Sequence, residues 1–350
     1  VVQGPREGTV EHLETNLGLL RERIKTPQFK VEFRTTGTNT KSTIAFGYLA
    51  HVVNPDVLAE FRRRLEGIER HEVLETAYVE DWIEDSPYSP FPQFRFTERT
   101  DSAAAALLEG KIIVLVRNTP MIMICPGLFA EFFGSSEDYY QRTLFSSLIR
   151  QLRIIAFFIA LTLPSIYVAL STFHPELIPT VLLLANLDTR EGIPFPVFVE
   201  ALIMEIFFEL LREAGIRLPR PVGSAVSIVG ALVIGQAAIQ AKIASPIMVI
   251  VVALTGIASF AIPHYNIAIA LRMLRFPLMA MASMLGGFGL MIGFLWILLH
   301  MCRLRSLGVP YLTSISPFKL KDMRDVVVRI PLKRMMRSSR YRRVHGGGRT

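Results

Sequence analysis

Three carboxylates recur on one face of a largely apolar stretch at residues 196–214. At 100° per residue of an α-helix, Glu205, Glu209 and Glu213 fall within a sector of about 80°. A row of acids on a helix can attract cations, and several copies of such a helix would form an acidic vestibule at the mouth of a cation pathway. The alternative is an amphipathic helix at the membrane interface, whose acids pair with neighbouring arginines.

The lipid bilayer limits where this acidic stripe can lie. A carboxylate that faces lipid at the bilayer centre costs roughly 2.5 to 3.5 kcal/mol, so the stripe must face water, protein or a pore. Pro196 and Gly215 are typical of the start of a helix and of the position just after its end. Glu200 lies apart from the stripe in the first turn, where the helix dipole stabilises a carboxylate, and we expect it to have a structural role.

A second pattern occupies residues 221–241, where valine and glutamine recur at intervals of three and four residues. The stripe consists of Val226, Val229, Val233, Gln236 and Gln240. In a ring of helices the valines would form a hydrophobic constriction and the glutamines a polar mouth, which makes all of them candidate pore-lining residues. Alternatively, the valines face lipid and the two amides bond to neighbouring helices.

Small residues form a stripe beside the valines and glutamines. Ser227, Ala231 and Gly235 are spaced four residues apart, which is the pattern that lets membrane helices approach closely, so we expect them at a helix-packing contact. The glycines of "GGFG" at 286–289 permit either a tight helix contact or a kink.

Both stripes belong to a chain whose composition indicates an integral membrane protein. Hydrophobic residues make up 51% of the 350 residues, the mean hydropathy is +0.39, and the apolar runs lie between residues 150 and 302. We expect about four membrane spans, at residues 154–171, 222–241, 246–262 and 278–302. Basic residues flank the first and last spans, which places both ends of this region in the cytoplasm; four crossings satisfy this rule, and six would also.

The predicted fold class is an α+β cytosolic domain followed by an all-α polytopic transmembrane domain and a basic tail. Residues 1–150 alternate helix and strand signals, with a helix expected after Asn54 and a hairpin around residues 118–120. Residues 151–302 form the transmembrane domain, which includes the amphipathic helix 196–214. Because the chain opens with Val, we expect the first domain to be truncated at its N-terminus.

The tail, residues 303–350, carries the positive charge of the protein. It holds thirteen Lys or Arg against two Asp, a net charge of +11, and we expect it to be partly disordered. A basic segment just beyond a membrane span suits anionic lipid headgroups. Nucleic-acid binding is the weaker interpretation, because no aromatic stacking platform or nucleic-acid-binding fold accompanies the charge.

The sequence contains no pattern typical of catalysis or of a bound cofactor. It has no nucleophile elbow and no phosphate-binding loop, and its two cysteines lack metal-ligand spacing. We therefore expect no enzyme activity, no catalytic residues, no cofactor and no metal site.

Long matching segments show that the sequence resembles the A subunit of the GerA-type spore germinant receptors. They include "VVQGPREG" at 1–8, "EDYYQR" at 137–142, "STFHPELIPT" at 171–180, "REGIPFP" at 190–196, "FELLREAGIRLPRPVG" at 208–223 and "IVGALVIGQAA" at 228–238. The resemblance extends from residue 1 to about residue 318. In that family more cytosolic sequence normally precedes "VVQGPREG", in agreement with a truncated start.

The resemblance implies a multi-pass protein of the inner membrane of the bacterial endospore, with the soluble domain and tail in the cytosol. It implies a homo-oligomeric ring, a pentamer, that forms a nutrient-gated channel and releases monovalent cations to start germination. The implied partners are membrane lipids, a transporter-like B subunit, which binds the nutrient, and a lipoprotein C subunit.

Three alternatives to a channel subunit stay open at the level of the sequence. One is a secondary transporter, which predicts inverted repeats and a site made by broken helices, but the sequence shows no internal repeat. Another is an accessory membrane scaffold of the germination machinery. The third is a germination paralogue from the stage V sporulation operon.

Overall fold

The computed structural model describes residues 4–313 and 327–331, apart from the side chains of residues 220–222 and 224–229. The chain divides into two compact units, and the first is built from both ends of the sequence. The first unit comprises Val1–Gln151 and His300–Thr350, and the second comprises Leu152–Leu299. The expected fold class, an α+β domain and then a helical region, is confirmed.

The centre of the first unit is a five-stranded antiparallel sheet with the order β1-β2-β4-β5-β3. Its strands are β1 (Phe29–Thr36), β2 (Ser42–Leu49), β3 (Arg95–Thr97), β4 (Ile112–Val116) and β5 (Ile122–Cys125). The expected hairpin is confirmed, because β4 and β5 pair around Asn118, whose φ of 67° suits a tight turn.

Helices cover both faces of this sheet. They are α1 (Leu13–Arg23), α2 (Pro55–Glu66), α3 (Thr76–Ile83) and α4 (Thr100–Leu108), and Asn54 caps α2 as expected. Alternate residues of β4 point to opposite faces. Ile112 and Val114 join one core with α2 and α3, whereas Ile113 and Leu115 join a second core with α1 and α4. All five residues of β4 are therefore buried.

A short hairpin after the last long helix completes the first unit. It consists of β6 (Arg305–Ser306) and β7 (Val309–Pro310). The Ser306 hydroxyl donates to the Gln93 carbonyl oxygen at 2.6 Å. Tyr311 is fully buried beside the rings of Phe129 and Phe132, with centroids 5.9 and 6.4 Å away. Residues that the sequence analysis assigned to the tail thus contribute to the core of the first unit.

Burial raises the pKa of Glu80 in α3 to about 8, and neighbouring Glu84, Asp81 and Glu75 add to the rise. Between pH 4.5 and about 8 the folded chain holds a proton that the unfolded chain has lost, so stability falls as the pH rises through this window. Glu80→Gln should remove this loss and add about 2 kcal/mol to the free energy of unfolding at pH 8, after allowance for solvent screening. Unfolding midpoints of the variant and the unmodified chain at pH 5 and pH 8 measure this gain in stability.

Glu66, an exposed carboxylate in α2, provides the control for this pH dependence. Glu66→Gln should leave the difference between the two midpoints as it is in the unmodified chain. A Glu80→Gln variant with the same difference would contradict the raised pKa.

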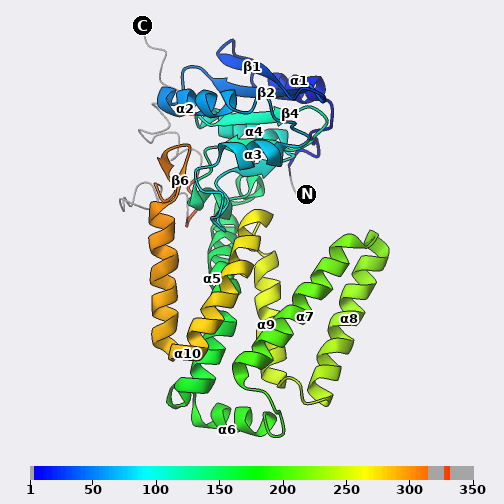
Figure 1. Ribbon diagram of the computed structural model, residues 1–350, viewed down its shortest axis with the longest axis vertical. Coiled ribbons are helices and arrows are strands. Elements are labelled where there is room, and N and C mark those ends of the chain that lie inside the picture. The colour runs from blue at the N-terminus through cyan, green and yellow to red at the C-terminus, as the bar shows by residue number, and fades with distance from the viewer. Residues whose placement is uncertain (1–3, 314–326, 332–350) are drawn as a thin grey trace. The chain divides into compact units, whose positions relative to one another are not determined.

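The second unit consists of helices only. They are α5 (Thr143–Phe173), α6 (Thr180–Thr189), α7 (Val197–Arg217), α8 (Arg220–Gln240), α9 (Pro246–Phe260) and α10 (Tyr265–Arg303), and α5 starts within the first unit. Figure 1 shows α5, α7, α8 and α9 running in alternating directions, with α6 lying across one end. In the described residues, α5 and α10 are long and apolar enough to cross a membrane. Helix α9 and the apolar part of α8 are shorter than such a membrane-crossing helix.

Helix α10 is a hairpin of two helical arms. Gly286 has φ 60° and ψ −137°, which reverses the chain there, and Figure 1 shows the two arms side by side. The arms pack closely, because a Cβ added at Gly289 would meet the Met281 carbonyl oxygen at 2.1 Å. The prediction of one continuous span over residues 278–302 is therefore wrong. The glycines of "GGFG" provide both a sharp turn and a close contact.

Candidate functional site in the helical unit

Helix α8 packs against α7 through glycines, and Gly235 also contacts one side chain of α9. A Cβ added at Gly230 would lie 2.7 Å from a methyl carbon of Leu211 in α7, and one at Gly235 would lie 3.6 Å from Val249 in α9. For the predicted packing stripe, the structure places Gly235 in a buried contact and leaves Ala231 exposed. The side chain of Ser227 lies outside the described part of the structure.

In the single chain, no other helix covers the described side chains of the valine and glutamine stripe, so they are exposed. Val233 is 55% exposed, and Gln236 and Gln240 are exposed one and two turns further on. Within the described residues, neither amide has a hydrogen-bond partner. The side chains of the other two predicted pore-lining residues, Val226 and Val229, lie outside the described part. Gln236 and Gln240 thus lie on the surface of the single chain, although a transmembrane helix would hide such polar side chains from lipid.

The three carboxylates of the predicted acidic vestibule have different surroundings. Glu205 is fully buried, Glu209 is 29% exposed at its side chain, and Glu213 is 58% exposed. Glu205 faces protein, because a cation from another helix of the same chain lies against it. Glu213 pairs with Arg217, one turn along α7, at 2.6 Å.

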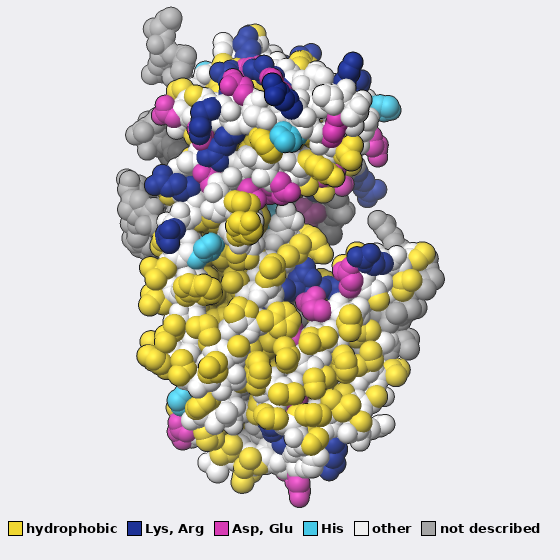
Figure 2. All heavy atoms as spheres, viewed as in Figure 1, with side chains coloured by type: hydrophobic (Ala, Val, Ile, Leu, Met, Phe, Trp, Pro, Cys, Tyr) yellow, Lys and Arg dark blue, Asp and Glu magenta, His cyan; other side chains and the backbone are white. Residues whose placement is uncertain are grey.

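Glu205 belongs to a charged cluster that joins three helices. It forms an ion pair with Arg275 of α10, whose Nε donates to the Ala160 carbonyl oxygen of α5 at 2.9 Å. Beside this pair, Glu209 binds Arg212 and also Arg272, the latter at 3.3 Å. In Figure 2 a patch of acidic and basic side chains interrupts the hydrophobic surface of the helical unit.

The cluster is not fully satisfied by the hydrogen bonds of the described residues. One carboxylate oxygen each of Glu205 and Glu209, and Nη2 of Arg275, are buried without a hydrogen-bond partner. A buried polar atom without a partner costs about 1 to 3 kcal/mol. Removal of one member of the Glu205–Arg275 pair would add an uncompensated buried charge to this cost.

Sequence reasoning did not anticipate the basic half of this cluster. Arg272 and Arg275 lie three residues apart in an apolar helix, and so share one face of it, as Glu205 and Glu209 do in α7. The sequence did contain a signal for this pairing: acids and arginines have similar spacing on two apolar helices, and charges within a membrane pair with one another.

Glu200 has the structural role expected for it. Its Oε1 accepts hydrogen bonds from the backbone N–H and the hydroxyl of Ser245, each at 2.6 Å. Ser245 is the N-cap of α9, so Glu200 fixes the start of α9 against α7. Arg190 lies 3.6 Å from the second oxygen of the carboxylate.

The described residues contain no group of three or more His, Cys, Asp or Glu that could hold a metal ion. What the helical unit presents is an exposed stripe with two amides, a set of glycine contacts and an internal charge cluster. In the described residues, the chain thus joins an α+β domain to apolar helices, of which α5 and α10 are long and apolar enough to cross a membrane. The chain belongs to the Bacillus/Clostridium GerA spore germination protein family, whose family model matches residues 1–341.

Relatives in Bacillus subtilis (strain 168) resemble nearly the whole chain. An uncharacterized membrane protein, YfkQ, is 50% identical over 96% of this chain and 66% of its own length. Spore germination protein KA is 49% identical over 94% of this chain and 60% of its own length. Spore germination protein A1 is 40% identical over 95% of this chain and 69% of its own length. The chain thus spans about two thirds or less of the first two relatives.

A solved structure matches part of the chain. It is the crystal structure of the N-terminal domain of the A subunit of the Bacillus megaterium spore germinant receptor GerK3. The match is 37% identical and covers 35% of this chain and 98% of that one, with a TM-score of 0.29.

Proposed function

We propose that the chain is the A-type membrane subunit of a spore germinant receptor and that several copies form a nutrient-gated ion channel. The channel releases monovalent cations across the inner membrane of the endospore and so starts germination. The family and the spore germination proteins among its relatives support this role. The proposed partners are further copies, as a pentamer, a transporter-like B subunit, a lipoprotein C subunit and membrane lipids.

The observation that carries the channel proposal is the open stripe of α8. Gln236 and Gln240 would each lose hydrogen bonds to water if they faced lipid, at a cost of several kcal/mol. A hydrated axis shared by several copies satisfies both amides. Val233 and, by helical spacing, Val229 and Val226 would then face the same axis and form a hydrophobic constriction.

The internal pairing of Glu205 removes the main objection to a crossing by α7. Its charge is neutralised by Arg275 inside the unit, so α7 exposes less charge to lipid than the sequence alone indicates. We therefore propose six crossings: α5, α7, α8, α9 and the two arms of α10. This even number returns the chain to the cytoplasmic side, where the domain of residues 1–150 and the tail of residues 303–350 lie.

Gating in this proposal requires no covalent chemistry. Nutrient binding to a partner shifts a two-state arrangement of the helices, and the valine constriction widens until water and cations enter. The more exposed acids, Glu209 and Glu213, form the vestibule that concentrates cations. Glu205 then serves the scaffold that holds α7 against α5 and α10.

Val233→Ala should make the channel leaky. Removal of two methyl groups at each copy widens and hydrates the constriction, and a barrier lower by about 1.4 kcal/mol raises the resting ion flux about tenfold. Potassium efflux from liposomes that contain the purified chain, without nutrient, measures the leak. Leu232→Ala is the control, because Leu232 is similarly exposed but lies about 100° around the helix. Equal efflux from both variants would contradict the pore position of Val233.

The same liposomes distinguish the alternative functions. Ion current without coupled substrate supports the channel. Flux that requires a substrate gradient would identify a secondary transporter, and silence in the presence of the partner subunits would favour an accessory scaffold.

A further inference from the structure

An open pocket of about 250 Å³ lies in the first unit beside α3. Buried Ile68 and Val73 contribute to its lining, together with His71, Tyr78 and Trp82. The rings of His71 and Trp82 are 4.2 Å apart, centre to centre. Tyr78 and Trp82 lie one helical turn apart and are 51% and 42% exposed, so two large aromatic side chains of one helix face open space.

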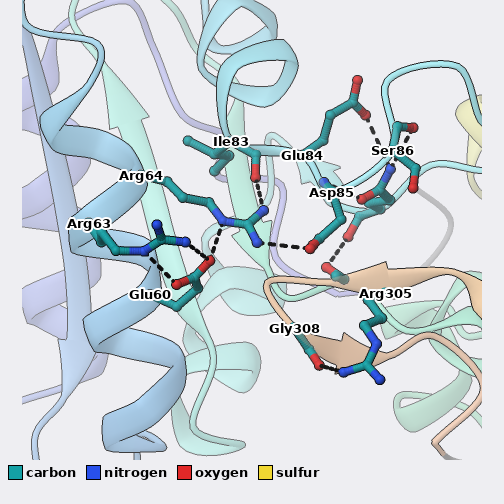
Figure 3. A network of polar contacts seen from close by, with 11 residues as sticks. Glu60, Arg63, Arg64, Ile83, Glu84, Asp85, Ser86, Arg305 and Gly308 are labelled. Atoms are coloured by element: carbon teal, nitrogen blue, oxygen red, sulfur yellow. Dashed lines mark hydrogen bonds and ion pairs between the residues drawn. The ribbon is translucent and has the colours of Figure 1, made fainter.

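The pocket lies in the most acidic stretch of the first unit. Residues 71–85 contain six carboxylates and no Lys or Arg, and Asp81 and Glu72 line the pocket itself. Arg64 of α2 is already engaged, because it bridges Glu60 and Asp85 at 2.7 and 2.8 Å, as Figure 3 shows. Across the described residues, Asp81 has no Lys or Arg nitrogen within 4.0 Å.

The remaining acids of this stretch also lack a cation. Glu75 caps α3 through the Ala77 N–H, and Glu72 accepts hydrogen bonds from the backbone N–H groups of Thr38, Asn39 and Thr40. Burial, and after it the neighbouring carboxylates, raises the pKa of Glu80 to about 8, so this residue adds little negative charge at neutral pH. Among the described residues, Asp81, Glu72 and Glu75 thus have no ion pair with Lys or Arg, although Asp85 is paired with Arg64.

Aromatic rings flanked by carboxylates bind guanidinium and ammonium groups. The cation lies over a ring face and the carboxylate accepts its N–H groups, and arginine suits both contacts. Pockets for drug-sized ligands have volumes of about 300 to 1,000 Å³, so this smaller pocket suits one or two side chains.

The chain itself supplies a segment of complementary chemistry. Residues 332–350 contain seven Lys or Arg and no Asp or Glu. Just before this segment, Arg329 is hydrogen-bonded to the first unit. Its Nη2 donates to the Tyr139 carbonyl oxygen, and its backbone N–H donates to the Ser147 hydroxyl, both at 3.1 Å. Nineteen extended residues reach up to about 60 Å, enough to span a domain of this size.

We propose that the basic C-terminal segment, residues 332–350, docks in the aromatic and acidic pocket beside α3. An arginine of the segment stacks on Trp82 and binds Asp81. Tethering to the same unit raises the local concentration of the segment to about the millimolar range, so a weak contact is sufficient for occupancy. The contact is screened by salt, because most of the charges are near the surface.

Fluorescence of Trp82 tests the docking. The chain has two tryptophans, so Trp296→Phe leaves Trp82 as the sole indole of the full-length protein in neutral lipid nanodiscs. Deletion of residues 332–350 should increase collisional quenching of Trp82 by acrylamide about twofold, because the ring loses its cover. A synthetic peptide of residues 332–350 should restore the protection at low salt and lose it at about 1 M salt.

Three controls make the result specific. A peptide with glutamine at its basic positions should give no protection. Asp81→Asn should weaken the effect of the basic peptide at least about threefold, whereas Glu22→Gln, an exposed acid of α1, should leave it unchanged. Quenching that is the same with and without the segment would overturn the proposal. Protection that appears only in anionic nanodiscs would also overturn it, because the segment would then bind lipid headgroups.

Discussion

Arg275→Ala should destabilise the helical unit by about 3 to 5 kcal/mol, because it leaves the Glu205 carboxylate buried without its partner. Both side chains are almost fully buried, and Arg275 also donates to α5 through the Ala160 carbonyl oxygen. The loss therefore affects three helices together. Chemical unfolding of the detergent-solubilised protein, followed by helical circular dichroism, measures it. Arg275→Lys provides a milder variant if the alanine variant does not fold.

A double variant separates the charge from the packing. Glu205→Leu with Arg275→Met replaces both partners by apolar side chains, and the pair should then lie within about 1.5 kcal/mol of the unmodified protein. Arg217→Ala is the matched control, because its exposed pair with Glu213 should contribute less than about 1 kcal/mol. If Arg275→Ala costs no more than Arg217→Ala, the buried pair has no structural importance.

Gly286→Ala should prevent the close reversal of α10 and cost about 3 kcal/mol or more. The backbone at Gly286 has φ 60° and ψ −137°, a conformation that essentially requires glycine. An added Cβ would also lie 2.8 Å from the Cβ of Phe173, which cannot rotate away. The expected result is a lower unfolding midpoint and faster proteolysis between the two arms of α10.

Gly287 is the control for the reversal. Its Cβ would approach only the end of the His174 side chain, at 3.3 Å, and its φ is not positive. Gly287→Ala should therefore cost less than about 1 kcal/mol. Equal effects of the two alanine variants would show that the reversal does not depend on the backbone at Gly286.

Local patterns were sufficient to predict much of the first unit. Asn54 before Pro55 gave the start of α2, and apolar runs on both sides of Asn118 gave the β4–β5 hairpin, because caps and turns depend on a few adjacent residues. The contacts of Ser306 and Tyr311 could not be found in this way. They join segments about 200 residues apart, and a short basic stretch gives no periodic signal.

In the helical unit the periodic stripes were visible, but the partner of each stripe was not. The acids of α7 predicted a helix face that avoids lipid. Such a face can lie against protein, water or a pore, and the spacing of the acids does not distinguish among these. The choice for Glu205 depends on Arg275, 70 residues further along the chain. The reversal at Gly286 was also ambiguous, because glycines in an apolar run indicate packing as often as a turn. The pore-lining and vestibule residues stay predictions.

The position of β6 and β7 affects how the protein is made. Ribosomes synthesise residues 305–311 after all of the helices, and yet Tyr311 lies fully inside the first unit. The nascent first unit therefore exposes the rings of Phe129 and Phe132 until translation of the helical unit is finished. A nascent chain stalled before residue 305 would have a first unit whose aromatic side chains are still exposed. Chaperone binding and aggregation should therefore be highest for such chains and should fall once the β6–β7 hairpin has left the ribosome.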